Sequence, residues 1–426
     1  MESLLQESPE ARVRSLIDYD IIMLALPRWD GQYSSTAYSL SKALSQHTRV
    51  FYVDNPFTIK SLLSERQSPQ IAKRKNALLF GKEVFSRPDT VYPNLVAVTP
   101  RVVFPVNFLP KGLAFDAISR VNDVIVKEAI SRIISEFKVK KYILINSFNP
   151  FYGRFFKLNP PPFLQVYQTV DNISESEYLH KHGVWLEEEW MKKSDFTIVT
   201  SSELKRTSEA NTSNVFLLPN AANTKLFQRA YREKFMRPKE LENIASDKRI
   251  ICYVGNICHR LDYQLLVKIA QENPDKVLLM IGPFANEQYK TSGLSSFPNV
   301  IFAGKKALEE LPAYLHFANV CIIPFLCNQL TKSIYPLKIN EYLSAGKPVV
   351  STTFSEDILS FSDVMYASDS HASFLANINK AIADDSPEFA QERVVRASPN
   401  NWEDRAQQFT VLVEEFLQRN DKRRFR

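Results

Sequence analysis

Two charged side chains stand one helical turn apart in residues 336–350. Lys338 and Glu341 are i, i+3 neighbours on a short predicted helix that Pro336 opens and Gly346 ends. A lysine near the positive N-terminal end of a helix suits a diphosphate. A carboxylate one turn further along can accept hydrogen bonds from two adjacent sugar hydroxyls. The pattern therefore predicts a site for a nucleotide-diphosphate sugar.

This stretch resembles the donor-binding element of retaining glycosyltransferases with the GT-B fold, in particular family four and its bacterial cell-surface polysaccharide subgroup. The resemblance implies that Glu341 binds the ribose hydroxyls of the donor. It also implies that Lys338 and the backbone of Tyr335, Pro336 and Leu337 hold the diphosphate. Many family members place another glutamate eight residues earlier, against the donor sugar, but Ser333 stands there in this chain. The identity of the donor sugar is therefore not implied. The alternative is that the motif is only a helix stop before a parallel strand.

A second group of candidates follows the apolar run 250–254. Gly255 ends this predicted strand, where a glycine lets a ligand approach the backbone, and Asn256 comes next. Arg260 precedes the following predicted helix, and a guanidinium there can bind phosphate through two parallel hydrogen bonds. In the family that the chain resembles, this loop holds a glycine and a basic residue that contacts the diphosphate. The alternative is an ion pair between Arg260 and Asp262.

Five further candidates follow other predicted strands. Lys305 lies where related enzymes place the nucleotide base. In the first half, Gly31 is the candidate for close approach by the donor phosphates, and Trp29 for stacking on an acceptor sugar. We expect Asn149 to contact the acceptor. Asp171 is the candidate for a catalytic contact, although it could equally cap the next helix.

Composition excludes several classes of protein. The chain has 426 residues, 45% of them hydrophobic and 23% charged, which allows two or three globular domains. No apolar run reaches the roughly 18 residues of a membrane span, and the acidic residues 1–9 lack the apolar core of a signal peptide. The four cysteines are spaced too widely for a zinc or redox motif, so we expect reduced thiols and a cytoplasmic protein. We expect no metal, and no cofactor besides a UDP- or GDP-sugar donor.

The net charge of +6 is modest, but basic residues cluster at 73–75, at 138–141 and at 422–426. Such clusters could rest on the anionic face of an inner membrane, or they could be ordinary solvated surface. No nucleic-acid-binding motif accompanies them, so we expect no nucleic-acid partner.

Apolar runs rich in β-formers alternate with amphipathic helical stretches, which predicts an α/β protein with parallel sheets. Residues 59–110 read as irregular. We predict the GT-B arrangement: two Rossmann-like, doubly wound domains facing across a cleft, with a C-terminal helix crossing back. The predicted parts are an N-terminal domain (1–225), a linker (226–248), a nucleotide-sugar-binding domain (249–398) and a terminal helix with a basic tail (399–426).

The leading hypothesis is a glycosyltransferase that moves a sugar from a nucleotide-diphosphate sugar to a glycan or lipid-linked acceptor, with retention, in cell-surface polysaccharide synthesis. We expect it in the cytoplasm, at or near the membrane face. Two alternatives stay open: a GT-B nucleotide-sugar epimerase or hydrolase, and a catalytically silent sugar-nucleotide-binding scaffold.

Overall fold

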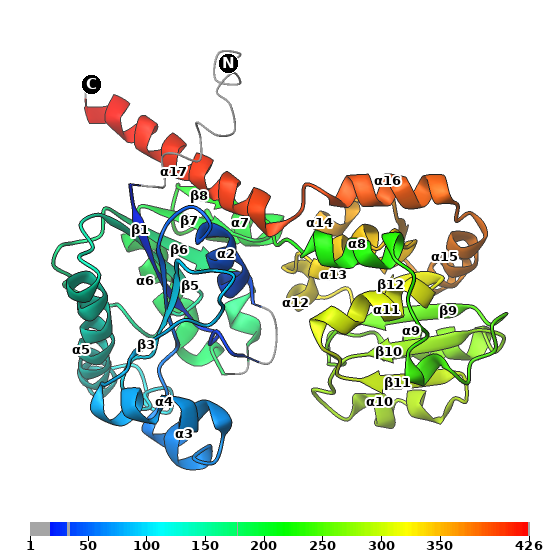
Figure 1. Ribbon diagram of the computed structural model, residues 1–426, viewed down its shortest axis with the longest axis horizontal. Coiled ribbons are helices and arrows are strands. Elements are labelled where there is room, and N and C mark those ends of the chain that lie inside the picture. Colours follow the sequence, from blue (N-terminus) through cyan, green and yellow to red (C-terminus); the bar gives the residue numbers. More distant parts are fainter. Residues whose placement is uncertain (1–17, 32–34, 177, 425–426) are drawn as a thin grey trace. The chain divides into compact units, whose positions relative to one another are not determined.

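The computed structural model describes residues 18–31, 35–176 and 178–424, which form two compact units (Figure 1). Unit 1 takes in the described residues up to Pro219 and those from Trp402 onward. Unit 2 comprises Asn220–Asn401. Each unit is a parallel sheet with helices packed on it, so the predicted α/β class with two Rossmann-like domains is confirmed.

The sheet of unit 1 has the strand order β3-β4-β2-β1-β5-β6-β7-β8, and all its neighbours are parallel except β3 and β4. The strands are β1 (Asp20–Ala25), β2 (Val50–Val53), β3 (Phe85–Ser86), β4 (Leu95–Val98), β5 (Tyr142–Ser147), β6 (Leu164–Thr169), β7 (Phe196–Val199) and β8 (Val215–Leu217). In register, Met23 lies opposite both Tyr52 and Ile145. Residues that follow β1, β2, β5 and β6 therefore meet at one edge of the sheet, the carboxyl edge.

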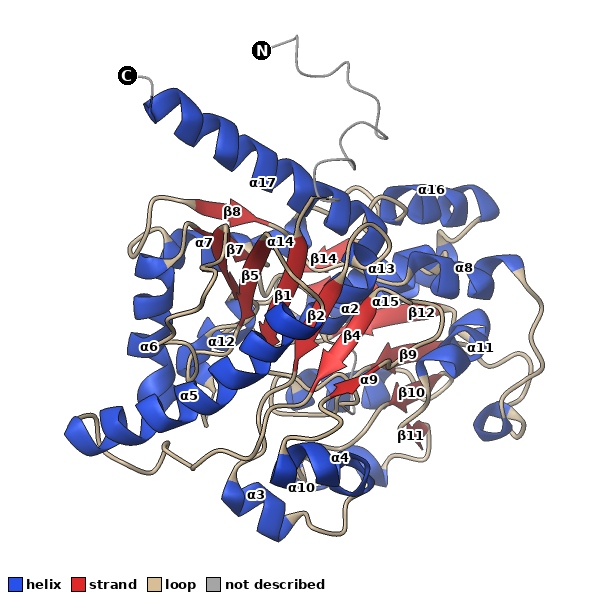
Figure 2. Ribbon diagram, turned by 60° about the vertical axis from the view of Figure 1, so that its left-hand side comes forward, coloured by secondary structure: helices blue, strands red, loops and turns tan. Residues whose placement is uncertain are grey.

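Helices cover both faces of this sheet (Figure 2). Ile21 and Met23 point toward α2 (Thr36–Leu44) and the C-terminal α17 (Trp402–Arg424), which contributes buried Phe409. Alternate residues point the other way, toward α5 (Leu113–Glu136). The other helices of this unit are α3 (Ile59–Ser64), α4 (Pro69–Phe80), α6 (His180–Lys193) and α7 (Ser202–Ser208).

The expectation that residues 59–110 are irregular is wrong. This segment contains α3, α4 and the paired strands β3 and β4, and β4 lies next to β2 within the sheet. Helix α4 carries complete end signals, with Ser68 as its N-cap, Pro69 in its first turn and left-handed Gly81 at its end. Strand β4 is only four residues long, so its apolar run is too short to stand out among the surrounding prolines.

The sheet of unit 2 has six parallel strands in the order β11-β10-β9-β12-β13-β14. They are β9 (Ile250–Val254), β10 (Val277–Ile281), β11 (Val300–Gly304), β12 (Val320–Ile323), β13 (Val349–Thr352) and β14 (Tyr366–Ser368). The helices are α8 (Thr224–Arg232), α9 (Tyr263–Glu272), α10 (Gln288–Thr291), α11 (Leu311–Phe317), α12 (Gln329–Lys332), α13 (Leu337–Ser344), α14 (Glu356–Leu359), α15 (His371–Ala383) and α16 (Pro387–Ala397).

The unit boundaries differ from the predicted ones, because residues 226–248 are not a linker. They hold most of α8, which packs on α11 and α13. Phe227, Ala230 and Leu241 are buried in the core of unit 2. Their apolar side chains are widely spaced among charged residues, so the segment looks like surface when only its composition is considered. The chain re-enters unit 1 at Trp402, close to the predicted start of the terminal helix at 399.

Candidate functional site

Helix α13 forms as its sequence predicts. Pro336 occupies the N-cap position without a side-chain cap bond, and Gly346 adopts φ +70° before β13. The hydroxyl of Tyr342 accepts a hydrogen bond from the Val254 N–H at 2.8 Å and lies 3.2 Å from the Val254 carbonyl oxygen, to which it can donate. These contacts hold α13 against the end of β9, where the predicted phosphate loop begins.

The side chain of Lys338 lies directly on the backbone of Gly255. A Cβ atom added to Gly255 would stand 2.2 Å from Lys338 Cε and 2.7 Å from its Nζ. The ammonium is half-buried, 5.6 Å from the ring centroid of Tyr253 and 5.5 Å from that of Phe325. Burial lowers the pKa of Lys338; Glu341 opposes this shift, and the positive charge of Arg260 adds to it. The glycine thus makes room for a cation at the strand end.

Residues 255–262 join the ends of three strands. The N–H of Ile257 donates to Pro283 after β10, and the N–H of Asp262 donates to Pro324 after β12, both at 2.9 Å. The Arg260 carbonyl accepts from Leu326 N–H, also at 2.9 Å. The backbone of this loop is therefore fixed, and it places Arg260 near Lys338.

The carboxylate of Asp262 has partners of its own. One oxygen accepts from Leu265 N–H at 2.9 Å and caps α9, and the other lies 2.8 Å from His371 Nε2. Asp262 is therefore occupied in holding α9 and α15.

Two oxygen-bearing side chains complete the group of residues around Lys338. Asn256 Oδ1 is buried and has no hydrogen-bond partner among the described residues. An unsatisfied buried acceptor is costly, so this atom is suited to a ligand donor. Glu341 is half-buried, and burial raises its pKa while Lys338 lowers it. Two cations, a buried amide oxygen and a carboxylate thus meet beside the N-terminus of α13.

The remaining residues predicted in this site differ in their burial and in their hydrogen bonds. Leu337 is half-buried in the first turn of α13, whereas Tyr335 packs in the core and its hydroxyl accepts from Asn340 at 3.3 Å. The predicted role of Tyr335 was a backbone contact, and its carbonyl oxygen accepts from Asn220 Nδ2 at 3.4 Å. Ser333 is buried and donates to the Gln329 carbonyl at 3.3 Å. Lys305 is exposed and follows β11.

In unit 1, Trp29 lies on a charged cluster at the carboxyl edge. Its backbone N–H donates to Asp54 Oδ1 at 3.0 Å, and its indole Nε1 is buried with no partner among the described residues. Arg74 is buried too and pairs with Asp30 at 2.6 Å and Asp54 at 3.2 Å. Burial raises the pKa of Asp54 to about 6, against the opposing charge of Arg74. Arg74 is thus a buried structural cation. The expectation that it belongs to a basic surface cluster at 73–75 is wrong.

Gly31 is exposed, and its N–H donates to the Arg28 carbonyl at 3.0 Å. Asn149 is fully buried at the end of β5. Its Nδ2 donates to the Ala25 carbonyl at 3.1 Å and lies 3.3 Å from Asn55 Oδ1, and its own Oδ1 has no partner among the described residues. Any acceptor contact of Asn149 would use this one oxygen.

Asp171 follows β6 and is half-buried, with Oδ1 accepting from Asn172 N–H at 3.0 Å. It does not cap the next helical turn, because Asn172 occupies that position. A second acid lies at the same strand end. Glu187 on α6 accepts from Tyr167 Oη at 3.1 Å, and burial raises its pKa to about 7, a shift that its hydrogen bonds to Thr169 and Tyr167 only partly offset.

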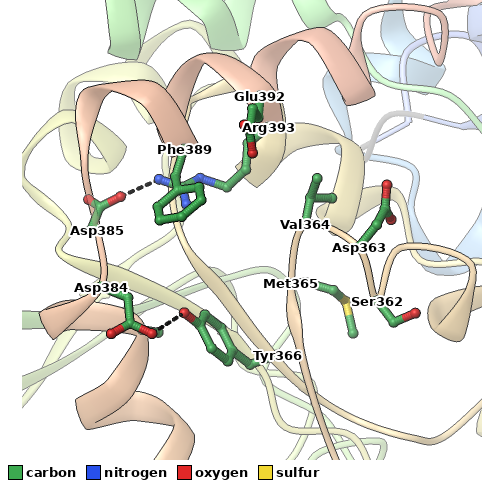
Figure 3. Close-up of a pocket in the computed structure, with 11 residues that line it drawn as sticks. Ser362, Asp363, Val364, Met365, Tyr366, Asp384, Asp385, Phe389, Glu392 and Arg393 are labelled. Carbon is green, nitrogen blue, oxygen red and sulfur yellow. Dashed lines mark hydrogen bonds and ion pairs between the residues drawn. The ribbon is translucent and has the colours of Figure 1, made fainter.

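A cavity of about 290 Å³ in unit 2 lies apart from these residues (Figure 3). Asp384, Asp385 and Glu392 are among its lining residues. Asp384 accepts from Tyr366 Oη at 3.0 Å, and Asp385 pairs with buried Arg393 (Figure 3). The acidic lining repels a diphosphate, and Arg393 serves the fold by donating to the Gly346 carbonyl at the end of α13, at 3.0 Å.

Within the part of the chain that the structure describes, no three His, Cys, Asp or Glu side chains are placed to hold a metal ion. Among the same residues, no helix combines the length and the hydropathy needed to cross a bilayer.

Three features of the site did not emerge from the sequence. Tyr342 was assigned to an apolar helix face, and its spacing gave no sign that the hydroxyl bonds to β9. Gly282 brings its Cα so close to the Gly255 carbonyl that an added Cβ would lie 1.9 Å from the oxygen. A glycine directly after a predicted strand was the available signal for it. Glu187 sits in a run of three glutamates, and only burial distinguishes it from its neighbours.

Parts of the chain are similar to known proteins in sequence. Residues 248–384 match the family described as glycosyl transferases group 1. The chain is 27% identical over 194 residues to a putative teichuronic acid biosynthesis glycosyltransferase, TuaH, of Bacillus subtilis (strain 168). That match spans 44% of this chain and 42% of the relative, so less than half of the relative's length is covered.

Solved structures resemble the whole chain. A sucrose-phosphate synthase from Thermosynechococcus elongatus superposes with a TM-score of 0.65 at 16% identity, covering 94% of this chain and 99% of that one. HepE of Anabaena, solved with UDP and glucose, gives 0.59 at 12% identity, covering 92% and 99%. The chain therefore has the GT-B fold, and its residues 248–384 are similar to the group 1 glycosyl transferases.

Proposed function

We propose that this chain is a glycosyltransferase that moves a sugar from a nucleotide-diphosphate sugar to a glycan or lipid-linked acceptor in cell-surface polysaccharide synthesis. The observation that carries the proposal is the placement of Lys338 on Gly255, beside Arg260 and one turn before Glu341. The family match covers these residues, and the name of the Bacillus subtilis relative places that relative in teichuronic acid biosynthesis.

The proposed donor site uses fixed charges rather than a metal ion. Lys338, Arg260 and the N-terminus of α13 would stabilise the negative charge that develops on the departing diphosphate. Glu341 would accept hydrogen bonds from the ribose hydroxyls, and Asn256 Oδ1 would take a further ligand donor. UDP is the first nucleotide to test, because HepE was solved with it; GDP is the second.

The proposed acceptor side is unit 1, at Trp29, Asn149 and Asp171, and Gly31 is the proposed position where the backbone lets the donor phosphates approach. We propose transfer with retention of the anomeric configuration. NMR of the product anomer would test this, and an inverted product would contradict it.

Nucleotide binding is the direct test of the donor site. Thermal shifts of the full chain with UDP, GDP, ADP, CMP and dTDP are expected to single out one nucleotide. A ligand that binds only the native state at a hundredfold excess over its Kd adds about 2.7 kcal/mol. Glu341→Ala is expected to abolish the shift, and the matched control is Glu272→Ala, an exposed glutamate at the end of α9. A shift that survives Glu341→Ala would refute the ribose contact, and no shift with any nucleotide would refute the donor site.

Product analysis would then separate transfer from the two alternatives. Release of free sugar or an epimerised donor, with no acceptor modified, would favour the epimerase or hydrolase. Nucleotide binding without turnover would favour the catalytically silent scaffold. The reason to consider a scaffold is that Ser333 stands where many family members have a glutamate.

We also propose that the protein works at the cytoplasmic face of the membrane. Exposed Lys138, Lys140 and Lys141 line a surface hollow of about 500 Å³ that also contains Asp18 and the paired Arg49 and Asp20, and the three lysines support contact with anionic lipid. The cluster at 422–426 lies outside the residues whose side chains are described. Flotation with phosphatidylglycerol vesicles, compared with phosphatidylcholine vesicles, tests this; equal recovery with both would contradict it.

A further inference from the structure

Arg28 is held rigidly at the carboxyl edge of the unit 1 sheet. It follows β1, and its Cζ lies 3.5 Å from the ring centroid of Phe57, which is only 1% exposed. Its Nε donates to the Asn55 carbonyl, after β2, at 3.1 Å. Stacking and this hydrogen bond fix the plane of the guanidinium, so its two Nη groups point in a set direction.

The half-buried charge of Arg28 has no carboxylate partner within 4.0 Å among the described residues. Asp54, Glu65 and Asp30 attract the Arg28 guanidinium, in that order of strength. Asp54 and Asp30 are both paired with Arg74, and Glu65 is solvent-exposed. Burial lowers the pKa of Arg28, and the attraction of Asp54 does not compensate for the lost hydration. A guanidinium nevertheless stays charged in proteins. A half-buried cation without a neighbouring counter-ion costs desolvation free energy, and binding an anion offsets that cost.

Unsatisfied groups occur on the same strand ends. Asn149 Oδ1 and Trp29 Nε1 are buried without partners among the described residues. The Nδ2 of Asn149 lies 3.3 Å from the side chain of Asn55, the residue whose carbonyl holds Arg28. A hydrogen-bond acceptor (Asn149 Oδ1), a hydrogen-bond donor (Trp29 Nε1) and a rigid cation (Arg28) therefore belong to neighbouring loops. Together they could bind a sugar that carries both hydroxyls and an acidic group.

We infer that Arg28 binds an anionic group of the acceptor, a carboxylate or a phosphate, so that the acceptor is an acidic sugar or a sugar phosphate rather than a neutral glycan. The planar fork of a guanidinium matches either group with two parallel hydrogen bonds. The inference rests on the proposed function, which supplies the reason for an acceptor site on unit 1.

The test uses the full chain and three small probes: D-glucuronate, D-glucose 1-phosphate and D-glucose. Ligand-observed NMR titrations give a Kd for each. We expect at least one anionic probe to bind at least about tenfold more tightly than glucose. Arg28→Gln is expected to abolish that preference, and Arg28→Lys to retain part of it, because charge is kept without the fork. Arg101→Gln is the matched control, since Arg101 is a half-exposed arginine of the same unit paired with Glu128 at 2.7 Å.

Each outcome decides something. Preference for glucuronate alone assigns a carboxylate, and preference for the sugar phosphate alone assigns a phosphate. Equal binding of all three probes to the wild type, or an unchanged preference in Arg28→Gln, overturns the inference.

Two further measurements on Arg28→Gln, its melting temperature and its thermal shift with nucleotide, separate anion binding from a structural role of Arg28. We expect a melting temperature equal to or above that of the wild type, and an unchanged nucleotide shift. A lower melting temperature together with lost probe binding would show a structural role and overturn the inference. If the wild type shows no nucleotide shift but an Arg28-dependent anion preference, the glycosyltransferase proposal fails while the anion site stands.

Discussion

Substituting Gly255 or Gly282 by alanine should strain the backbone at both positions, since both glycines follow neighbouring strands with positive φ, but Gly255→Ala should in addition weaken nucleotide binding. At Gly255 an added Cβ would meet Lys338 Cε at 2.2 Å, whereas at Gly282 it would meet the Gly255 carbonyl oxygen at 1.9 Å. Ordinary contact for a Cβ begins near 3.4 Å. The flexible end of a lysine can move by the required distance of more than 1 Å. The Gly255 carbonyl cannot, because the N–H groups of Gly255 and Ile257 on either side of it are hydrogen-bonded to Ile281 and Pro283.

The expected magnitudes follow from these distances. Gly255→Ala displaces the Lys338 ammonium, and a hydrogen bond to a charged group is worth about 1.5–3 kcal/mol, so nucleotide affinity should fall about 10- to 100-fold. Its φ of +149° adds about 1–3 kcal/mol of strain. Gly282→Ala combines similar strain, at φ +147°, with about 1–3 kcal/mol of overpacking. Its melting temperature should fall by roughly 5 °C or more, at about 2–4 °C per kcal/mol.

A double-mutant cycle with Lys338→Met shows whether the loss at Gly255 acts through the lysine. Calorimetry with the nucleotide that gives the largest thermal shift supplies the four affinities. Lys338→Met alone should weaken binding about as much as Gly255→Ala, and the double variant no more than either, because both remove one contact. Wild-type affinity in Gly255→Ala, or losses that simply multiply in the double variant, would refute the reasoning.

Two further predictions concern stability. Tyr342→Phe removes the hydroxyl that accepts from the N–H of buried Val254, and should destabilise the protein by about 1–3 kcal/mol in urea unfolding; no change would mean that this contact does not hold α13. Glu187→Gln tests the raised pKa of Glu187. The carboxyl takes up a proton near pH 7 in the folded protein and only near 4.5 in the unfolded chain, so protonation favours the folded state. The free energy of unfolding of the wild type should therefore rise by about 1–2 kcal/mol, relative to the variant, as the pH falls from 8 to 5.5. Parallel unfolding curves of the two proteins at both pH values would contradict it.

Local sequence signals predict the helices and strands correctly wherever those signals are complete. Pro336 and Gly346 delimit α13, and alternating apolar residues define the two faces of β1. The spacing of Lys338 and Glu341 required no tertiary information, because residues three apart share a helix face. The same reasoning failed for β4, whose four residues gain their stability from β2 rather than from local preference. It also failed for residues 226–248, where a few buried side chains are hidden among charges.

The fold is needed to learn which loops meet and which buried charges lack an opposite charge beside them. Gly255 and Lys338 are 83 positions apart in the sequence (338 − 255), and it is the parallel order β9-β12-β13 that brings α13 back to the end of β9. Arg28 and Arg74 look alike in sequence, as basic residues near aromatic ones. Folding gives Arg74 two carboxylates and gives Arg28 an aromatic ring and a carbonyl. The balance of charge around a buried cation depends on neighbours distant in the chain, and so it cannot be found from local sequence.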